Sequence, residues 1–156
     1  MTKIEPLDSF DRKLLELLQL DVHQPVAALA EKVGLSAPAC YRRMRRLREA
    51  GVIEREIAVV RPKTLGWPLS MIVLVSLERE NANTVAEMFD MFRAEPAVIE
   101  AWNVTGDHDF AVRIIARDME SYDDLVRRMF SAHERVRTFE TLVVIRETGT
   151  SPVPVA

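Results

Sequence analysis

Cysteine, histidine and long apolar runs are scarce in this sequence. The chain of 156 residues contains one cysteine, Cys40, and three scattered histidines, which excludes an internal disulfide framework and a cysteine-based zinc finger. Its longest nearly uninterrupted apolar stretch, Leu69 to Leu77, is far shorter than the roughly 18 residues that a membrane span requires. No secretory signal pattern opens the sequence. We therefore expect a soluble, cytoplasmic protein with no membrane partner.

Motifs of catalysis and cofactor binding are missing as well. The sequence shows no nucleophile elbow, no phosphate-binding glycine loop and no dinucleotide fingerprint. We therefore expect a protein that is not an enzyme and that carries no cofactor.

Charge is distributed unevenly along the chain. The formal net charge of -3 argues against indiscriminate coating of nucleic acid. Up to Arg61, however, the chain has 11 Lys and Arg against 9 Asp and Glu, whereas the remainder has 10 against 15. The change in charge coincides with the segment 61–68, which contains two prolines and one glycine. Neither a helix nor a central strand accommodates these residues. We predict one domain over 1–60, a hinge over 61–68, a second domain over 69–148 and a flexible tail over 149–156.

The first domain has the apolar spacing of three helices. Asp8 can cap the first, and its core-facing stripe is Phe10, Leu14, Leu17 and Leu18. The second covers 26–33 and ends at Gly34, where a left-handed backbone is easy. Ser36 caps the third, whose inner stripe is Ala37, Cys40, Met44 and Leu47. The segment 52–60 is rich in β-branched residues and predicts an extended strand.

The third helix is unusually rich in arginine, with five in the seven positions 42–48. A short helix, a glycine turn and a basic helix make a helix-turn-helix arrangement, and the guanidinium group binds phosphate and reads guanine. At about 100° per residue, the side chains that point outward are Pro38, Arg42, Arg45, Arg46 and Glu49. We predict that double-stranded DNA is bound through Pro38, Ala39 and Arg42 on base edges and through Tyr41, Arg43, Arg45, Arg46 and Arg48 on phosphates, together with Ser36.

A simpler interpretation of the basic helix stays open at this point. Its arginines can form a solvated face with salt bridges to Glu49 or Glu54. The preceding short helix and the Gly34 turn favour DNA binding over this alternative. Cys40 lies on the inner stripe, which predicts a small buried apolar residue rather than a reactive thiol.

The second domain alternates strand and helix patterns. Strands are predicted at 69–77, 98–104, 110–116 and 136–146, and helices around 85–92 and 119–130. The order βαββαβ is that of a ferredoxin-like domain, so we predict an α+β protein with both helices on one face of a four-stranded sheet. The stretches 71–75 and 142–145 are apolar on both faces. A second copy covering the open face is the simplest explanation, which predicts a homodimer.

Several stretches, in this order, resemble the Lrp/AsnC family of transcriptional regulators, named after the leucine-responsive regulatory protein. They are Leu7–Asp11, Leu29–Ser36, Cys40–Leu47, Gly51–Ile53 and Val104–Asp109. The resemblance implies a helix-turn-helix domain followed by a ferredoxin-like domain that dimerises, assembles into octamers in many members and binds an amino acid at a subunit interface. It also implies that the effector site includes Gly106, Asp107, His108 and Asp109.

Elementary chemistry is compatible with an effector at this turn. A carboxylate can hold an ammonium group, and backbone N–H groups near a glycine can hold a carboxylate. Two alternatives remain: an ordinary Asp-rich hairpin turn, and a metal site at Asp107, His108 and Asp109, which no paired-histidine motif accompanies. Trp102 and Tyr122 fall on apolar positions and are predicted in the core, although Trp102 can also face a ligand pocket.

These observations predict a sequence-specific, DNA-binding transcriptional regulator that is modulated by an amino-acid-like effector. One alternative is an architectural protein that wraps DNA without an effector. The other is an amino-acid-binding regulatory subunit of a metabolic enzyme, because ferredoxin-like domains serve several functions.

Overall fold

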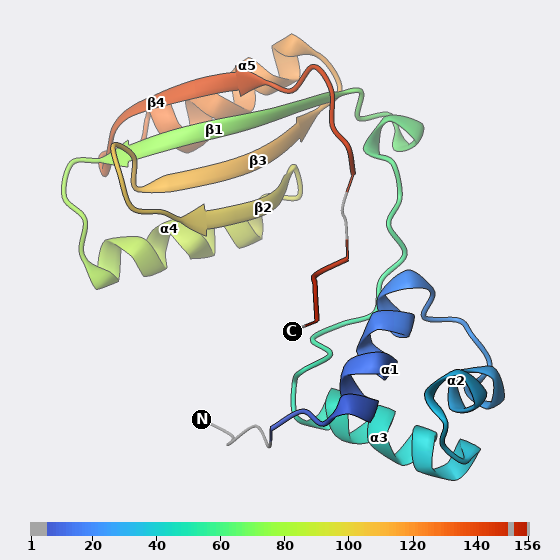
Figure 1. Cartoon of the computed structure of the whole chain (residues 1–156). Helices are drawn as coiled ribbons and strands as arrows, with labels where there is room; N and C mark the ends of the chain where they lie inside the picture. The colour runs from blue at the N-terminus through green and yellow to red at the C-terminus, as the bar shows by residue number, and fades with distance from the viewer. Residues whose placement is uncertain (1–5, 150–151, 156) are drawn as a thin grey trace. The chain divides into compact units, whose positions relative to one another are not determined.

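The structure of the chain, a computed structural model, describes residues 6–149 and 152–155 (Figure 1). These residues form two compact units. The helical unit contains the described residues up to Val59 and those from Thr148 onward, and the sheet unit is Val60–Glu147. The parts of the predicted first domain and tail at residues 1–5, 150, 151 and 156 lie outside the described residues.

Three helices make the helical unit: α1 (Ser9–Leu20), α2 (Val26–Val33) and α3 (Ala37–Glu49). A capping box begins α1, in which the Asp8 side chain accepts from the Asp11 N–H and the Asp11 carboxylate accepts from the Asp8 N–H. Gly34 ends α2 with a φ of 84°, the left-handed conformation expected there. Ser36 caps α3, as its position predicts.

The core of the helical unit lies between these three helices. Leu14, Leu29 and Cys40 are fully shielded from solvent, and Met44 and Leu47 are nearly so. The predicted inner stripe of α3 is therefore confirmed at Cys40, Met44 and Leu47, whereas Ala37 at the start of the helix is exposed. In the described part of the tail, the backbone of Val153 accepts from and donates to the Gln19 side chain on α1, at 3.0 and 2.7 Å.

The segment 52–60, predicted as a strand, has no regular secondary structure among the described residues. A strand requires a neighbour whose backbone groups complete its hydrogen bonds, and no such neighbour lies along this segment within the described chain. Two of its β-branched residues, Ile57 and Val59, remain 62% and 81% exposed. In the hinge that follows, Pro62–Leu65 forms a single 3-10 turn, η1.

The sheet unit has the predicted βαββαβ order. Its elements are β1 (Leu69–Leu77), α4 (Ala82–Ala94), β2 (Val98–Asn103), β3 (Phe110–Ala116), α5 (Met119–Val126), the π-helical turn η2 (Arg127–Ser131) and β4 (Val136–Val143). The strands are antiparallel in the order β2-β3-β1-β4. The ferredoxin-like α+β prediction is confirmed, and the last strand ends three residues earlier than predicted.

The core of this unit lies between the sheet and its two helices, which Figure 1 shows on the same side of the sheet. Alternate residues of the central strands point into it, among them Val73, Val75 and Val112. The Phe110 ring packs edge-on against Phe92, with centroids 5.4 Å apart. Tyr122 is buried as predicted, and its hydroxyl forms a 2.6 Å hydrogen bond with the Thr141 hydroxyl.

Among the described residues of the sheet unit, no helix covers the opposite face of the sheet. Ile72 and Leu74 of β1 are half-buried there, and Leu142 of β4 is exposed. The prediction that Trp102 lies in the core is wrong, because its side chain is 47% exposed. Trp102 lies on the edge strand β2 and pairs with Ala111 of β3, which in turn pairs with Leu74 of β1, so Trp102 and Leu74 share the open face. Among the described residues, no helix is both long and apolar enough to cross a membrane.

Candidate nucleic-acid interface and effector turn

The turn between α2 and α3 sets the direction of the basic helix. The Gly34 N–H donates to the carbonyls of Ala30 and Glu31, which closes α2. Two residues later the Ser36 hydroxyl oxygen accepts from the Ala39 N–H at 3.4 Å and begins α3. Pro38 stands in the first turn of α3, where a missing N–H has no cost. This is the helix-turn-helix arrangement that the sequence predicts.

The exposed face of α3 carries Pro38, Tyr41, Arg42, Arg45 and Arg48, with Ala39 half-buried beside them. The Arg42 guanidinium has neither an ion pair nor a hydrogen bond with any described residue. Arg45 pairs with Glu49 at 2.7 Å, but the two side chains are 69% and 62% exposed. Arg48 pairs with Glu56 at 2.7 Å. Exposed pairs of this kind contribute little to stability, so phosphate groups can replace the glutamates.

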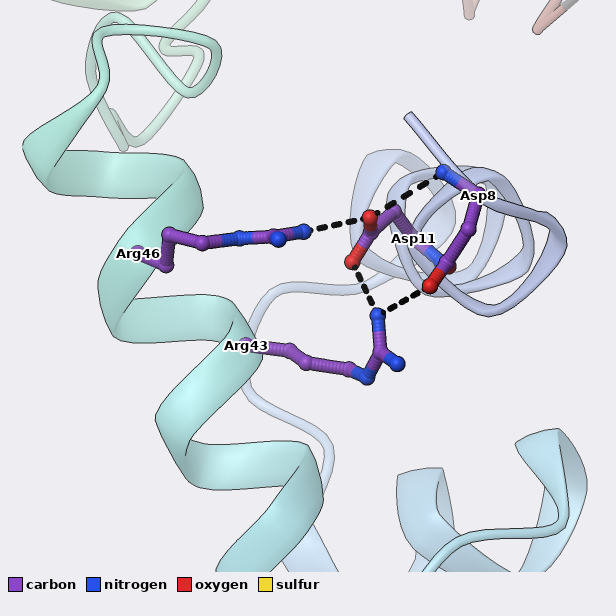
Figure 2. A network of polar contacts seen from close by, with 4 residues as sticks. All are labelled: Asp8, Asp11, Arg43 and Arg46. Carbon is purple, nitrogen blue, oxygen red and sulfur yellow. Dashed lines mark hydrogen bonds and ion pairs between the residues drawn. The ribbon is translucent and has the colours of Figure 1, made fainter. Parts of the chain in front are cut away.

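Arg43 and Arg46 have a different environment, which Figure 2 shows. Both extend from α3 toward the start of α1, where Arg43 contacts Asp11 at 2.9 Å and Asp8 at 2.7 Å and Arg46 pairs with Asp11. Arg46, predicted to point outward, has 43% of its side chain exposed but directs its guanidinium to Asp11. Arg43 and Arg46 follow each other by three residues on the flank of α3 that packs against α1, and their long side chains reach the carboxylates there.

The burial of Asp11 distinguishes these contacts from the exposed pairs. Asp11 is completely shielded from solvent, and a buried carboxylate requires cationic partners. The arginine side chains remain partly in solvent, 25% exposed for Arg43 and 43% for Arg46. Because Asp11 engages both guanidinium groups, Arg43 and Arg46 are less available for the predicted phosphate contacts than Arg42, Arg45 and Arg48 are.

The charges in this network shift pKa values in the expected directions. The pKa of Asp8 lies below its ordinary value, first because its carboxylate accepts from the Asp11 backbone N–H and also because of Arg43. The pKa of Arg43 is raised by its hydrogen bonds to Asp8 and Asp11. Both shifts favour the charged forms of Asp8 and Arg43.

Sequence reasoning missed the role of Asp11. The signal was present, because Asp11 precedes Leu14 by three residues and Leu18 by seven and therefore lies on the buried stripe of α1. A carboxylate on a buried stripe indicates a cation on the helix that packs against it.

The second candidate region is the turn between β2 and β3. Gly106 has a φ of 137°, which favours glycine. The Asp109 carboxylate accepts from the Leu77 N–H at 2.6 Å, and the Asp109 N–H donates to the Val75 carbonyl at 2.9 Å. Asp109 therefore attaches the turn to the end of β1 and has less capacity left for a ligand.

His108 is oriented by Ser76, a buried residue of β1. The Ser76 hydroxyl lies 3.1 Å from His108 Nδ1 and 3.3 Å from the Asp107 carbonyl oxygen. A hydroxyl has one proton, and a carbonyl can only accept. When Ser76 donates to the Asp107 carbonyl, its oxygen can accept from His108 Nδ1–H, and in the tautomer with its proton on Nδ1 the ring lone pair lies on Nε2.

A cavity of about 410 Å³ lies at this turn. Three of the four predicted effector residues line it, namely Gly106, His108 and Asp109, whereas Asp107 does not. Glu80 and Asn103 also line it, and the Asn103 amide donates to the Glu80 carboxylate at 3.0 Å. Glu80 was missed because it lies in the loop after β1 and reaches the turn only through strand pairing. Among the described residues, no group of three His, Cys, Asp or Glu side chains is placed to hold a metal.

Both units match known protein families. Residues 7–48 match the AsnC-type helix-turn-helix domain, and residues 70–154 match the Lrp/AsnC ligand binding domain. The chain is 43% identical over 150 residues to an HTH-type transcriptional regulator of Sinorhizobium fredii, which covers 96% of this chain and 89% of that protein. It is 37% identical over 141 residues to the leucine-responsive regulatory protein of Rhizobium meliloti, covering 90% of each.

Solved structures agree with this result. A transcriptional regulator of Neisseria meningitidis in complex with L-Met has a TM-score of 0.87 and 26% identity, covering 96% of this chain and 97% of that one. A basic helix-turn-helix unit joined to a ferredoxin-like unit defines a DNA-binding transcriptional regulator, and this chain belongs to the Lrp/AsnC family. The expectation that it is not an enzyme is confirmed, because the family consists of transcriptional regulators.

Proposed function

We propose that this regulator binds duplex DNA in the cytoplasm through the exposed face of α3. Pro38, Ala39 and Arg42 face base edges, because residues near the start of the recognition helix lie deepest in the major groove. The phosphate contacts come from Ser36, Tyr41, Arg45 and Arg48. The observation that carries this proposal is the exposed guanidinium of Arg42, which no acidic residue of the described chain neutralises.

The effector is an amino acid that binds at the Gly106 turn. The match to the Lrp/AsnC ligand binding domain and the L-Met complex of the Neisseria meningitidis protein support this class of ligand. The Glu80 carboxylate and His108 Nε2 provide acceptors for the ammonium group, and backbone N–H groups beside Gly106 provide donors for the carboxylate. Asp107 and Asp109 have smaller roles than the sequence suggested.

The functional particle is a homodimer that joins the open faces of two sheets, with further assembly to an octamer. The uncovered apolar side chains Ile72, Leu74, Trp102 and Leu142 support this arrangement. Effector binding changes the relative populations of assembly states or of DNA-binding placements, and so changes operator affinity.

A titration of the full chain tests the effector part. A duplex that the chain binds is first selected from a random pool. The affinity for this duplex and the sedimentation of the protein are then measured in the presence of L-methionine and of each other amino acid in turn. At least one amino acid should change the affinity by about 5- to 150-fold or change the assembly state. Glu80→Gln should raise the concentration needed by about tenfold, because a charged hydrogen bond is lost.

Glu78→Gln is the matched control. It changes the same charge in the same loop, but Glu78 is exposed and does not line the cavity, so the titration should match the unmodified chain. If no amino acid changes affinity or assembly, the effector proposal is wrong and an architectural function is favoured. If no duplex is selected at all, the DNA proposal itself is contradicted.

A further inference from the structure

The network around Asp11 separates the arginines of α3 into two groups. Arg43 Nη1 contacts Asp11 Oδ1 at 2.9 Å and Asp8 Oδ2 at 2.7 Å, and Arg46 pairs with Asp11 Oδ2 (Figure 2). The Asp8 N–H also donates to Asp11 Oδ2, at 3.2 Å. Both oxygens of this fully buried carboxylate are thus occupied, one by each arginine, while Arg42 and Arg45 lie on the exposed face.

The same contacts constrain the rotation of α3 about its own axis. Arg43 and Arg46 are one turn apart and converge on one carboxylate of α1, so a rotation of α3 would break at least one contact. The Arg43 guanidinium also lies over the Phe10 ring, with its Cζ 5.3 Å from the ring centroid. This cation–π contact adds to the ion pairs that hold Arg43. Asp11 is placed to hold α3 with Arg42 and Arg45 outward.

The network also removes charge from the DNA interface. The positive charges of Arg43 and Arg46 are balanced by the negative charges of the two aspartates. The other cations of α3, which remain available for phosphates, are Arg42, Arg45 and Arg48. Each phosphate that a protein neutralises contributes a slope of about -0.9 to the plot of log affinity against log salt. A chain that withholds Arg43 and Arg46 therefore has a weaker salt dependence than its five arginines suggest.

We propose that Asp11 is a positioning residue for DNA recognition: it orients α3 and withholds Arg43 and Arg46 from the phosphates, which limits sequence-independent binding. This inference rests on the proposed binding through the exposed face of α3. It assigns Asp11, which need not touch DNA, a direct influence on how strongly any duplex is held.

Asp11→Asn in the full chain tests the inference. The variant retains shape but loses the charge that holds the two arginines. Its thermal stability should fall, and its binding to a random-sequence duplex should become more salt-dependent. With up to two more phosphate contacts per helical unit, the loss of affinity between 50 and 200 mM salt should grow by about tenfold for each helical unit that binds the duplex. Preference for the selected duplex over a scrambled one should fall.

Glu16→Gln is the charge control, because Glu16 is exposed on the same helix and has no ion pair among the described residues. It should leave both stability and salt slope close to those of the unmodified chain. A merely structural role for Asp11 would lower the active fraction of Asp11→Asn without changing the slope, and that result would overturn the proposal.

A second pair of variants decides the question even if Asp11→Asn does not fold. Arg46→Gln should keep the salt slope of the unmodified chain, whereas Arg45→Gln, one position away on the same helix, should reduce it by about 0.9 per helical unit. Equal reductions in both would overturn the withholding role. An unchanged slope in Arg45→Gln would instead contradict the proposed DNA interface.

Discussion

The helical unit and the sheet unit obtain their internal order in different ways. The core of the helical unit is small and includes a fully buried carboxylate paired with two arginines. The larger core of the sheet unit contains no charged residue among its buried members and is built around packed phenylalanines. Its two buried polar residues, Ser76 and Thr84, are uncharged.

This difference corresponds to what each unit has to position. A small core buries a limited apolar area, and apolar packing alone has little directional preference. Ion pairs with defined geometry add direction, which matters where one helix must present specific side chains. The sheet unit has to keep one face covered and leave the other available, and layered apolar packing is sufficient for that.

Truncations in the two cores are expected to have the largest effects. Phe110→Ala should reduce the free energy of unfolding of the sheet unit by about 3 to 5 kcal/mol, and Leu14→Ala should reduce that of the helical unit by about 2 to 5 kcal/mol, since each leaves a cavity. Denaturant titration followed by hydrogen exchange measures both effects. Loss of protection should be confined to the unit that carries the substitution, because the two buried clusters share no residue.

Leu20→Ala provides the matched control for Leu14→Ala. Leu20 lies on the same helix with its side chain 72% exposed, so its truncation should change stability by less than about 0.5 kcal/mol. If Phe110→Ala removed protection equally from α1 and α3, the comparison between two separately ordered units would not hold.

A smaller effect is expected at the aspartates that cap one helix in each unit. The pKa of Asp8 is lowered by its hydrogen bond from the Asp11 N–H, and that of Asp118 by its hydrogen bond from the Ser121 N–H. A folded-state pKa below the unfolded value means that the stabilisation is present above about pH 4 and is lost as pH falls through the folded pKa. Asp8→Asn and Asp118→Asn should each flatten this acid-dependent loss.

Hydrogen exchange between pH 2 and pH 6 assigns each effect to its helix. Asp8→Asn should act on α1 and Asp118→Asn on α5. Asp124→Asn is the control, because Asp124 is exposed on α5 and does not cap it. If the loss of protection with falling pH were the same in both cap variants as in the unmodified chain, the caps would not contribute in the way the structure indicates.

Periodicity was sufficient for most of the fold. The stripes of α1 and α3 follow from burial on one face, which leaves a regular signal in the sequence, although Phe10 and Ala37 at their starts are exposed. The strand β1 was predictable from its nearly continuous apolar run. The prediction of a strand over 52–60 was wrong because a strand depends on a pairing partner. The β-branched residues of this segment favour an extended chain, but composition does not reveal whether a partner strand is present. The prediction of a buried Trp102 was wrong for a similar reason, because an edge strand with an uncovered face does not bury every aromatic residue.

The candidate sites were less predictable because they depend on which elements pack together. Helical geometry places Arg43 and Arg46 about 60° apart around α3, but only the packed structure shows that both guanidinium groups reach Asp11. Glu80 reaches the Gly106 turn through the pairing of β1 with β3, and no local motif marks it. Conversely, the Gly34 turn and the Ser36 cap were predictable because their causes are local.

The salt dependence of DNA binding by Arg45→Gln tests the central claim most directly. Affinity for the selected duplex is measured between 50 and 200 mM salt for this variant and for the unmodified chain. If the exposed face of α3 holds DNA, the slope of log affinity against log salt falls by about 0.9 per helical unit. An identical slope in the two proteins would show that this face does not contact the phosphates.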